Sequence, residues 1–196
     1  MLIDLARTRG LVRPHDLTPL GISRVALTRA VRRGQLERVG RGLYRLPDRP
    51  ISAHGSFAEV ARRVPKGVVC LLSALSFHEL TRQLPFQVWL AIDNKAAAPK
   101  LDYPPLRITR FSGAALTEGI EEHAIDDVTV RVTGVAKTVA DCFKYRNKIG
   151  LDVALEALRE AWFARRMTSD EIWHYAKIDR VANVIRPYLE SVACGD

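Results

Sequence analysis

Several features that define common classes of protein are missing from this chain of 196 residues. No apolar run approaches the roughly 18 residues needed to span a bilayer, so we expect no membrane-spanning helix. Only 3 cysteines are present, Cys70, Cys142 and Cys194, and an odd number of widely spaced thiols is typical of a reducing cytoplasm. The first residues, Met1-Leu2-Ile3-Asp4, have an acid where a signal peptide has a base. We therefore expect a cytoplasmic protein with no membrane association.

Sequence motifs of catalysis are missing as well. The chain has no G-x-S-x-G, P-loop or H-E-x-x-H motif, and no Cys/His spacing suits a zinc site. We expect a protein that is not an enzyme and that needs no metal and no cofactor. Cys70 and His78 would lie on one helix but two turns apart, too far to act as a pair. A buried thiol and a hydrogen-bonded histidine are the expected roles.

One triplet leaves a nuclease as a minor alternative. Asp93-Asn94-Lys95 follows an apolar strand, and D-x-K at the end of a strand occurs in restriction-endonuclease-like folds. Such folds need further upstream acids to hold Mg²⁺ through oxygen ligands. Glu59 and Glu79 are the only candidates, and neither follows the proline expected there. A strand that runs into a charged loop explains the triplet adequately.

Lysine and acidic residues are scarce at the start of the chain. Residues 1–50 contain 11 Arg, no Lys and 4 acids, a net charge of +7 out of the total of +8. The remaining 146 residues hold 19 Lys and Arg against 18 acids, a net charge of +1. This asymmetry predicts a nucleic-acid-binding head on a nearly neutral body. The alternative is a solubilising basic face.

Residues 1–47, which we call the head, have the pattern of a winged helix-turn-helix. Ser23 is a good N-cap and Gly34 a good helix terminator, while a glycine at position 21 allows a tight turn. Two short alternating segments joined by Gly40-Arg41-Gly42 predict a basic β-hairpin, the wing. The expected elements are helices over 1–9, 14–17 and 24–33, the turn at 20–22, and strands over 35–39 and 43–46.

The helix over 24–33 divides into two faces at about 100° per residue. Leu27, Ala30 and Val31 face the core of the head, and the opposite face is available to the major groove. Arginine can bridge guanine O6 and N7, and threonine or valine can contact a thymine methyl group. We expect three groups of DNA contacts: Arg24, Val25, Thr28 and Arg29 on base edges, Ser23 and Arg32 near the backbone, and Arg33, Arg38, Arg41 and Arg45 on phosphates.

The head resembles the N-terminal domain of AbiEi-type antitoxins of type IV toxin–antitoxin systems. The resemblance rests on Gly21-Ile22-Ser23-Arg24, on Arg33-Gly34-Gln35-Leu36, and on the stretch from Arg38 to Arg45. It implies an antitoxin that represses its own operon by binding inverted repeats in the promoter. It also implies neutralisation of a cognate nucleotidyltransferase toxin, with or without direct contact. An inverted repeat binds two copies of the antitoxin, either as a homodimer or as two monomers.

The rest of the chain predicts an α+β body over residues 56–196, after a linker over residues 48–55. Expected helices cover 56–63, 68–82, 135–146, 151–165, 168–178 and 179–192, and expected strands cover 86–92, 106–111, 121–125 and 128–132. The stretches from Cys70 to Leu80 and from Thr138 to Leu155 also resemble AbiEi-type proteins. That resemblance weakens over 95–118 and after about residue 166.

Thr138, Asp141 and Arg146 could form a polar cluster on the surface of the body. The alternative is a structural link between helices through Asp141 and Arg146. The AbiEi resemblance implies that some surface of the body neutralises the toxin, and this cluster is one candidate. The three tryptophans lie outside the basic head and are expected in the core or in an interface; they are Trp89, Trp162 and Trp173.

Overall fold

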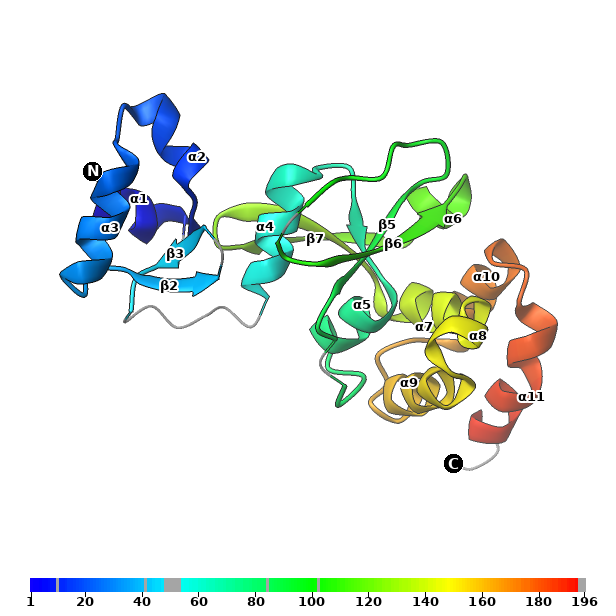
Figure 1. Ribbon diagram of the computed structural model, residues 1–196. Helices are drawn as coiled ribbons and strands as arrows, with labels where there is room; N and C mark the ends of the chain where they lie inside the picture. Colours follow the sequence, from blue (N-terminus) through cyan, green and yellow to red (C-terminus); the bar gives the residue numbers. More distant parts are fainter. Residues whose placement is uncertain (10, 41, 48–53, 84, 102, 194–196) are drawn as a thin grey trace.

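The chain folds into two unequal parts, each with its own β-sheet (Figure 1). The computed structural model describes residues 1–196 apart from 10, 41, 48–53, 84, 102 and 194–196. The predicted α+β class is confirmed, because helices and two sheets of three and five strands alternate along the chain. Most of the predicted linker, and Arg41, lie outside the described residues.

The head contains three α-helices, a 3-10 turn and a three-stranded sheet. Its elements are α1 (Leu2–Arg9), β1 (Leu11–Val12), α2 (Pro14–Leu17), η1 (Thr18–Leu20), α3 (Arg24–Arg32), β2 (Glu37–Gly40) and β3 (Leu43–Arg45). The predicted hairpin forms, with β2 and β3 antiparallel. Strand β1 was not predicted; it pairs with the other edge of β3, which gives the order β1-β3-β2.

A small apolar core holds the head together. Its fully or almost fully buried members come from the three α-helices, from strand β1 and from the loop after α3: Ala6, Val12, Leu17, Leu27, Ala30 and Leu36. Gly21 and Gly34 adopt positive φ angles of 64° and 66° on either side of α3. Since a residue with a Cβ is strained there, these glycines set both ends of the helix.

The body is built around a five-stranded sheet of order β6-β5-β4-β8-β7. Its strands are β4 (Val68–Val69), β5 (Val88–Asp93), β6 (Leu106–Phe111), β7 (Ile120–Ile125) and β8 (Val128–Thr133). Its helices are α4 (Gly55–Arg63), α5 (Leu71–Phe77), α6 (Ala114–Thr117), α7 (Val135–Lys144), α8 (Arg146–Ile149), α9 (Leu151–Phe163), α10 (Ser169–Ile178) and α11 (Ala182–Ala193). None of the described helices is long and apolar enough to cross a membrane.

The two faces of this sheet are covered by different helices. Strand β5 shows the alternation, since Val88 and Leu90 pack in one cluster with Phe57 of α4. Trp89 and Ala91 pack in a second cluster with α5, α7 and the C-terminal helices. Successive side chains of a strand point to opposite faces, so one central strand supplies two separate cores. Figure 1 shows α4 on the side of the body next to the head and α9 to α11 at the far end.

The predicted helix over residues 68–82 is wrong in both its start and its length. Val68 and Val69 form the central strand β4, which pairs with β5 and with β8. Cys70 is extended, and α5 covers only Leu71–Phe77. Glu79 takes a positive φ of 58° just after it. Val68 and Val69 are β-branched, which favours a strand. Periodicity cannot distinguish a strand from a buried helix in a short apolar run, so pairing with the neighbouring strands determines the structure here.

Four further local predictions have different outcomes. The sequence predicts Ser56 as the N-cap of α4, but the N-cap is His54 and no side chain supplies the cap hydrogen bond. The segment from Thr168 to Glu171 predicts a capping box, and these two residues form it at the start of α10. The helical period places Leu151 toward the core, but this residue is 37 % exposed. Pro187 is expected to kink or split the last helix, whereas α11 continues through it from Ala182 to Ala193.

Candidate nucleic-acid interface

Helix α3 buries one face and exposes the other as predicted. Leu27 is 2 % and Ala30 4 % exposed, while Val31 is half-buried. The Ser23 hydroxyl accepts a hydrogen bond from the Val25 N–H at 3.2 Å, which caps the first turn. The opposite face (Val25, Thr28, Arg29 and Arg32) is exposed, as are the other residues of this segment predicted to contact DNA: Ser23, Arg24 and Arg33.

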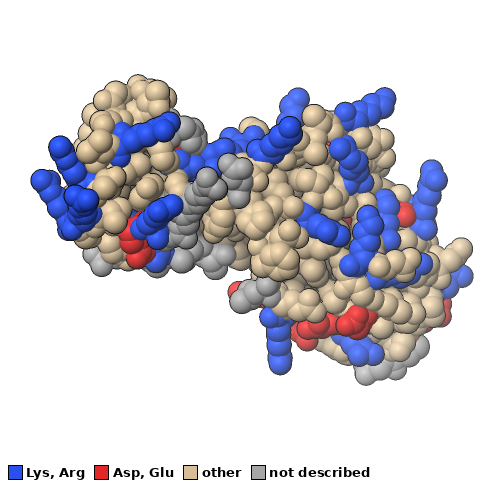
Figure 2. Space-filling view, in the orientation of Figure 1, with Lys and Arg blue, Asp and Glu red and all other residues tan. Residues whose placement is uncertain are grey.

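The exposed face of α3 is strongly basic. Residues 23–34 contain four arginines and no acid. Figure 1 places α3 at the end of the head that is remote from the body, and Figure 2 shows Lys and Arg side chains projecting from that end. A row of arginines without interleaved acids produces the positive potential that attracts a phosphate backbone.

One of the arginines that the sequence predicts on phosphates is paired with an acid of the hairpin. Arg38 is exposed, but the Arg45 guanidinium forms an ion pair with Glu37 across the two strands. The pairing of β2 with β3 is irregular between Arg38 and Gly40. Strand β2 runs toward the body in Figure 1. The contact predicted for Arg41 concerns a residue outside the described part of the chain.

A buried ion pair joins the head to the body. The Arg13 Nη2 atom lies 2.8 Å from Oε1 of Glu59 on α4 and also donates to the carbonyl oxygen of Tyr103. Arg63 lies 3.3 Å from the same carboxylate. Arg13 and Glu59 are only 9 % and 8 % exposed. Glu59 therefore has a structural role between two arginines.

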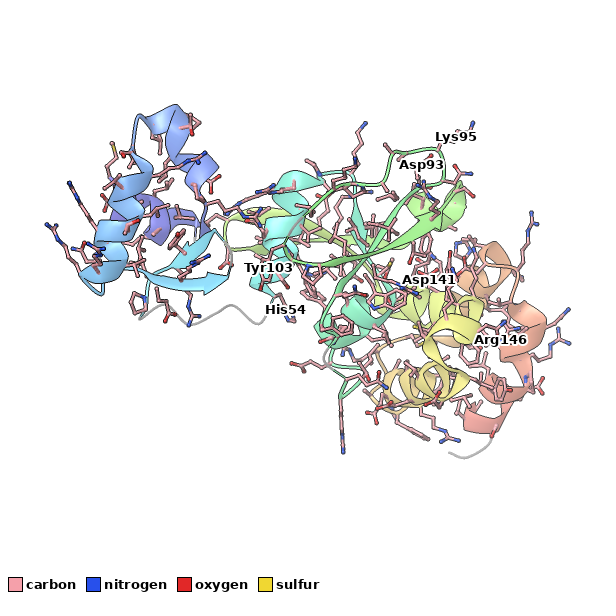
Figure 3. All side chains as sticks on the ribbon, in the orientation of Figure 1. His54, Asp93, Lys95, Tyr103, Asp141 and Arg146 are labelled. Carbon is pink, nitrogen blue, oxygen red and sulfur yellow. The ribbon has the colours of Figure 1, made fainter. Side chains whose placement is uncertain are left out.

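The structure does not bring Thr138, Asp141 and Arg146 together. The Thr138 hydroxyl lies 2.9 Å from the carbonyl oxygen of Thr133 and 2.7 Å from its hydroxyl. Arg146 donates to the carbonyl oxygen of Phe143 at 2.9 Å. Figure 3 shows Asp141 and Arg146 well apart, so the expected link between these two residues is wrong.

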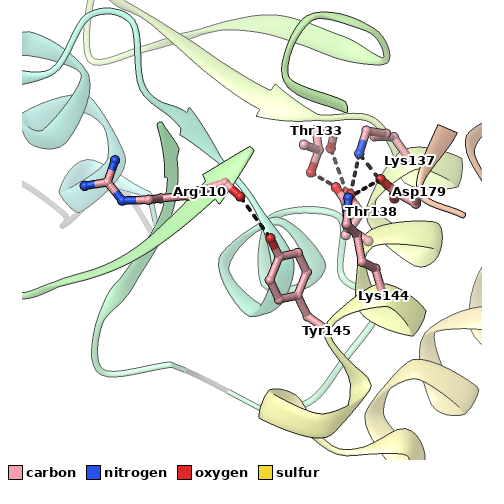
Figure 4. Close-up of polar contacts among 8 residues, drawn as sticks. Arg110, Thr133, Lys137, Thr138, Lys144, Tyr145 and Asp179 are labelled. Atoms are coloured by element: carbon pink, nitrogen blue, oxygen red, sulfur yellow. Dashed lines mark hydrogen bonds and ion pairs between the residues drawn. The ribbon is translucent and has the colours of Figure 1, made fainter. Parts of the chain in front are cut away.

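Lys137, which the sequence analysis missed, is the partner of Asp141. The lysine is completely buried, pairs with Asp141 one turn away, and lies 3.5 Å from Oδ2 of Asp179 (Figure 4). Lys144 lies 3.1 Å from Oδ1 of Asp179. Burial raises the pKa of Asp141 well above its usual range, although the charge of Lys137 opposes that rise. The spacing of a lysine and an aspartate four residues apart was a signal for the pair.

Two expectations for the core of the body are confirmed. Cys70 and Cys142 are fully buried, and burial raises the pKa of both thiols. His78 is 6 % exposed, and its Nε2 atom lies 2.7 Å from the carbonyl oxygen of Thr133. Burial lowers the pKa of His78. Cys70 and His78 flank α5 at its two ends, and this corrects the prediction that one helix carries both.

The Asp93 triplet forms an exposed turn. The Asp93 carboxylate accepts a hydrogen bond from the Lys95 N–H at 2.8 Å, as in an Asx turn, and Figure 3 shows both residues at the edge of the body. No group of three or more His, Cys, Asp or Glu side chains suited to a metal ion occurs among the described residues. Trp89 is buried and lies beneath the Arg107 guanidinium, whereas Trp162 and Trp173 are half-buried.

Comparison with known families finds that the basic head is similar to a class of transcriptional regulators. More particularly, residues 1–47 match the family model described as transcriptional regulator, AbiEi antitoxin. The resemblance seen in the sequence is thereby confirmed for the head, where α3 and the hairpin lie. A comparison with curated proteins finds no match.

Proposed function

We propose that this protein is a DNA-binding antitoxin that represses its own type IV toxin–antitoxin operon. The observation that carries the proposal is the AbiEi match over residues 1–47, the segment that bears the exposed basic face of α3. A regulator needs a positive surface to approach DNA and a helix that can enter a groove. The head supplies both in one element.

The head acts as a winged helix-turn-helix with α3 in the major groove. Four exposed side chains of α3 contact base edges, and the others position the helix on the backbone. The base-reading residues are Arg24, Val25, Thr28 and Arg29. The positioning residues are Ser23 and Arg32 beside the backbone, and Arg33, Arg38, Arg41 and Arg45 on phosphates. Arg45 must leave Glu37, or share it, to reach a phosphate.

The operator is an inverted repeat that binds two copies of the protein. Two-fold symmetry of the DNA then matches two heads, whether the copies form a dimer in solution or meet on the operator. The body neutralises a cognate nucleotidyltransferase toxin. Direct contact with the toxin and an indirect effect both fit this role, and neither requires a metal or a cofactor.

A gel-shift titration tests the DNA-binding part of the proposal. The probe is the duplex immediately upstream of the protein's own gene, with scrambled duplex as competitor, at two salt concentrations. We expect specific retention that is lost on deletion of residues 1–47. Weak binding without preference, falling steeply with salt, would contradict a repressor and leave the head as a general DNA anchor.

A stand-alone repressor is the second candidate. The observation in its favour is that the family match covers residues 1–47 and does not extend into the body. Co-expression with the neighbouring gene separates the two candidates. Rescue of growth from a toxic nucleotidyltransferase supports the antitoxin. Autorepression without rescue supports the stand-alone repressor.

A further inference from the structure

The body has a pocket of about 360 Å³ on the side next to the head. Its walls come from the start of α4, from the end of α5, and from the two segments that lead into β5 and β6. Figure 3 shows two of the lining residues, His54 and Tyr103, on this side of the body. Pockets that bind small molecules start at about 300 Å³ and occur preferentially where domains meet.

The lining of this pocket is aromatic and polar but carries no charge. Phe57 is 6 % exposed, whereas Phe86 is 86 % exposed although its side chain is large and apolar. Hydroxyl, amide and imidazole groups come from Ser56, Ser76, Tyr103, Gln87 and His54. No Lys, Arg, Asp or Glu is among the described residues that line the pocket. Burial lowers the pKa of His54, so its ring is neutral at pH 7.

This lining selects a particular kind of molecule. The rings of His54 and Phe57 are stacked with their centroids 5.3 Å apart, and exposed Phe86 offers a further aromatic surface for a planar ring. Hydroxyl and amide groups both donate and accept hydrogen bonds, so they match a ligand edge that has one donor and one acceptor. A charged ligand would lose its hydration without gaining an opposite charge. The pocket therefore fits a neutral, planar aromatic molecule with an amide-like edge.

The pocket shares its walls with the two contacts that hold the head. Arg13 of the head donates to the carbonyl oxygen of Tyr103 and lies 2.8 Å from the carboxylate of Glu59 on α4. Tyr103 lines the pocket, and the first turn of α4 lines it through Ser56 and Phe57. A molecule in the pocket therefore contacts both body elements to which Arg13 is bound.

We propose that this pocket binds a neutral, planar aromatic small molecule, and that its occupancy changes the affinity of the head for the operator through Arg13. The second part of this inference rests on the proposed function. A ligand that favours one orientation of the head shifts the population toward that orientation. Two heads on one operator need a defined orientation, so the molecule in the pocket regulates repression.

Benzamide is the probe, because its ring and amide edge have the required chemistry. Benzoate and benzamidine are matched controls with nearly the same shape and a negative or a positive charge. Each probe is titrated into the isotopically labelled full chain, and the resonances of the lining residues are followed by NMR. The proteins are the wild type, Phe86→Ala, and Phe163→Ala. Phe163 is an exposed aromatic residue of α9 that does not line the pocket.

We expect benzamide to shift the lining resonances of the wild type and of Phe163→Ala with a Kd of about 1–10 mM, as for other ligands of this size. Phe86→Ala should bind benzamide at least about threefold more weakly, because an aromatic contact is lost. Benzoate and benzamidine should bind at least about tenfold more weakly than benzamide. Absence of shifts at the lining residues, equal binding of the three probes, or undiminished binding by Phe86→Ala would each overturn the proposed site.

A gel-shift titration of the upstream duplex tests the coupling to the head. With benzamide at about ten times its Kd, we expect the Kd of the wild type for the operator to change at least about fivefold in either direction. Benzoate at the same concentration should leave it unchanged. An unchanged affinity with the pocket filled would overturn the coupling. Absence of specific operator binding without any probe would contradict the proposed function, whereas the NMR titration judges the site by itself.

Discussion

Arg29 lies on the exposed face of α3, among side chains that have no acidic neighbour on the helix. We expect Arg29→Ala to lose about 1–3 kcal/mol of preference for the operator over scrambled DNA, because an arginine that bridges a guanine discriminates by about that amount. Fluorescence anisotropy with both duplexes measures the difference. An equal loss on both would make Arg29 a phosphate contact. Arg159→Ala on α9, far from the head, is the control.

His78 gives the stability of the body a dependence on pH. Burial lowers its pKa, so the unfolded chain takes up a proton at a higher pH than the folded chain. The stability contributed by neutral His78 is present above about pH 6.5 and is lost as the pH falls below that value. We expect the melting temperature to drop between pH 7 and pH 5.

His78→Gln separates this residue from the other histidines. Glutamine retains a donor for the Thr133 carbonyl but does not titrate. The drop in melting temperature between pH 7 and pH 5 should therefore be smaller in the variant. His54, whose pKa is also lowered by burial, leaves a residual effect. The exposed His174 serves as control, and His174→Gln should keep the full drop. An unchanged drop in His78→Gln would rule out this residue as the cause.

Exposure of single side chains was predictable where a helix has two clear faces. The exposure of Val25, Thr28, Arg29 and Arg32 follows from periodicity alone. Arg45 was not predictable in this way, because its partner Glu37 lies across a hairpin and depends on register. Lys137 was missed for a related reason. Only the packing of α7 against the end of α10 buries it beside Asp179.

At the scale of the elements, the Lys137 cluster ties α7 to the turn after α10. Lys137→Met leaves Asp141 and Asp179 in the core without their shared cation. We expect the free energy of unfolding to fall by about 3–5 kcal/mol, the usual cost of removing one partner from a buried pair. Urea denaturation measures it. Lys144, one-third exposed, is the control, and Lys144→Met should cost at most about 1 kcal/mol.

Wild-type stability of Lys137→Met at pH 7 would show that Asp141 needs no cation and would contradict the expected role of Lys137. A large fall at pH 7 that becomes smaller as the pH is lowered, because Asp141 then takes up a proton, would support the ion cluster.

The elements that the sequence predicted best are those with a local signal. Strand β6 and the β7–β8 hairpin agree closely with the alternation seen in the sequence, and the capping box marks the start of α10. Strands β1 and β4 have two residues each, too few for any periodicity. Both exist because neighbouring strands supply hydrogen bonds, which a single sequence does not show.

At the scale of the whole molecule, the Arg13–Glu59 ion pair joins the head to the body. We expect Glu59→Ala to release the head, because Arg13 and Arg63 lose their shared carboxylate. Small-angle scattering should then show a larger radius of gyration and a broader distribution of distances. Glu122→Ala, an exposed site on β7, should scatter like the wild type. Unchanged scattering from Glu59→Ala would assign the fixed orientation to other contacts.

The sequence predicted a basic head and a body but not this contact between them. Charge asymmetry indicates which segment approaches DNA, since it depends on composition alone. The pairing of Arg13 with Glu59 joins residues 46 positions apart, and the sequence holds many other arginines and glutamates. Only the fold selects this pair.

The position of α3 has a consequence for how transcription of the proposed operon would depend on the amount of protein present. The helix lies at the end of the head that is remote from the body (Figure 1). With α3 in a groove, the body projects away from the duplex and its surface stays open to solvent. Under the proposed function, a copy on the promoter would keep its body accessible to a toxin, and a copy bound to a toxin through the body would keep α3 accessible to the promoter. Transcription would respond to the total number of antitoxin molecules made, whether or not each one is already occupied.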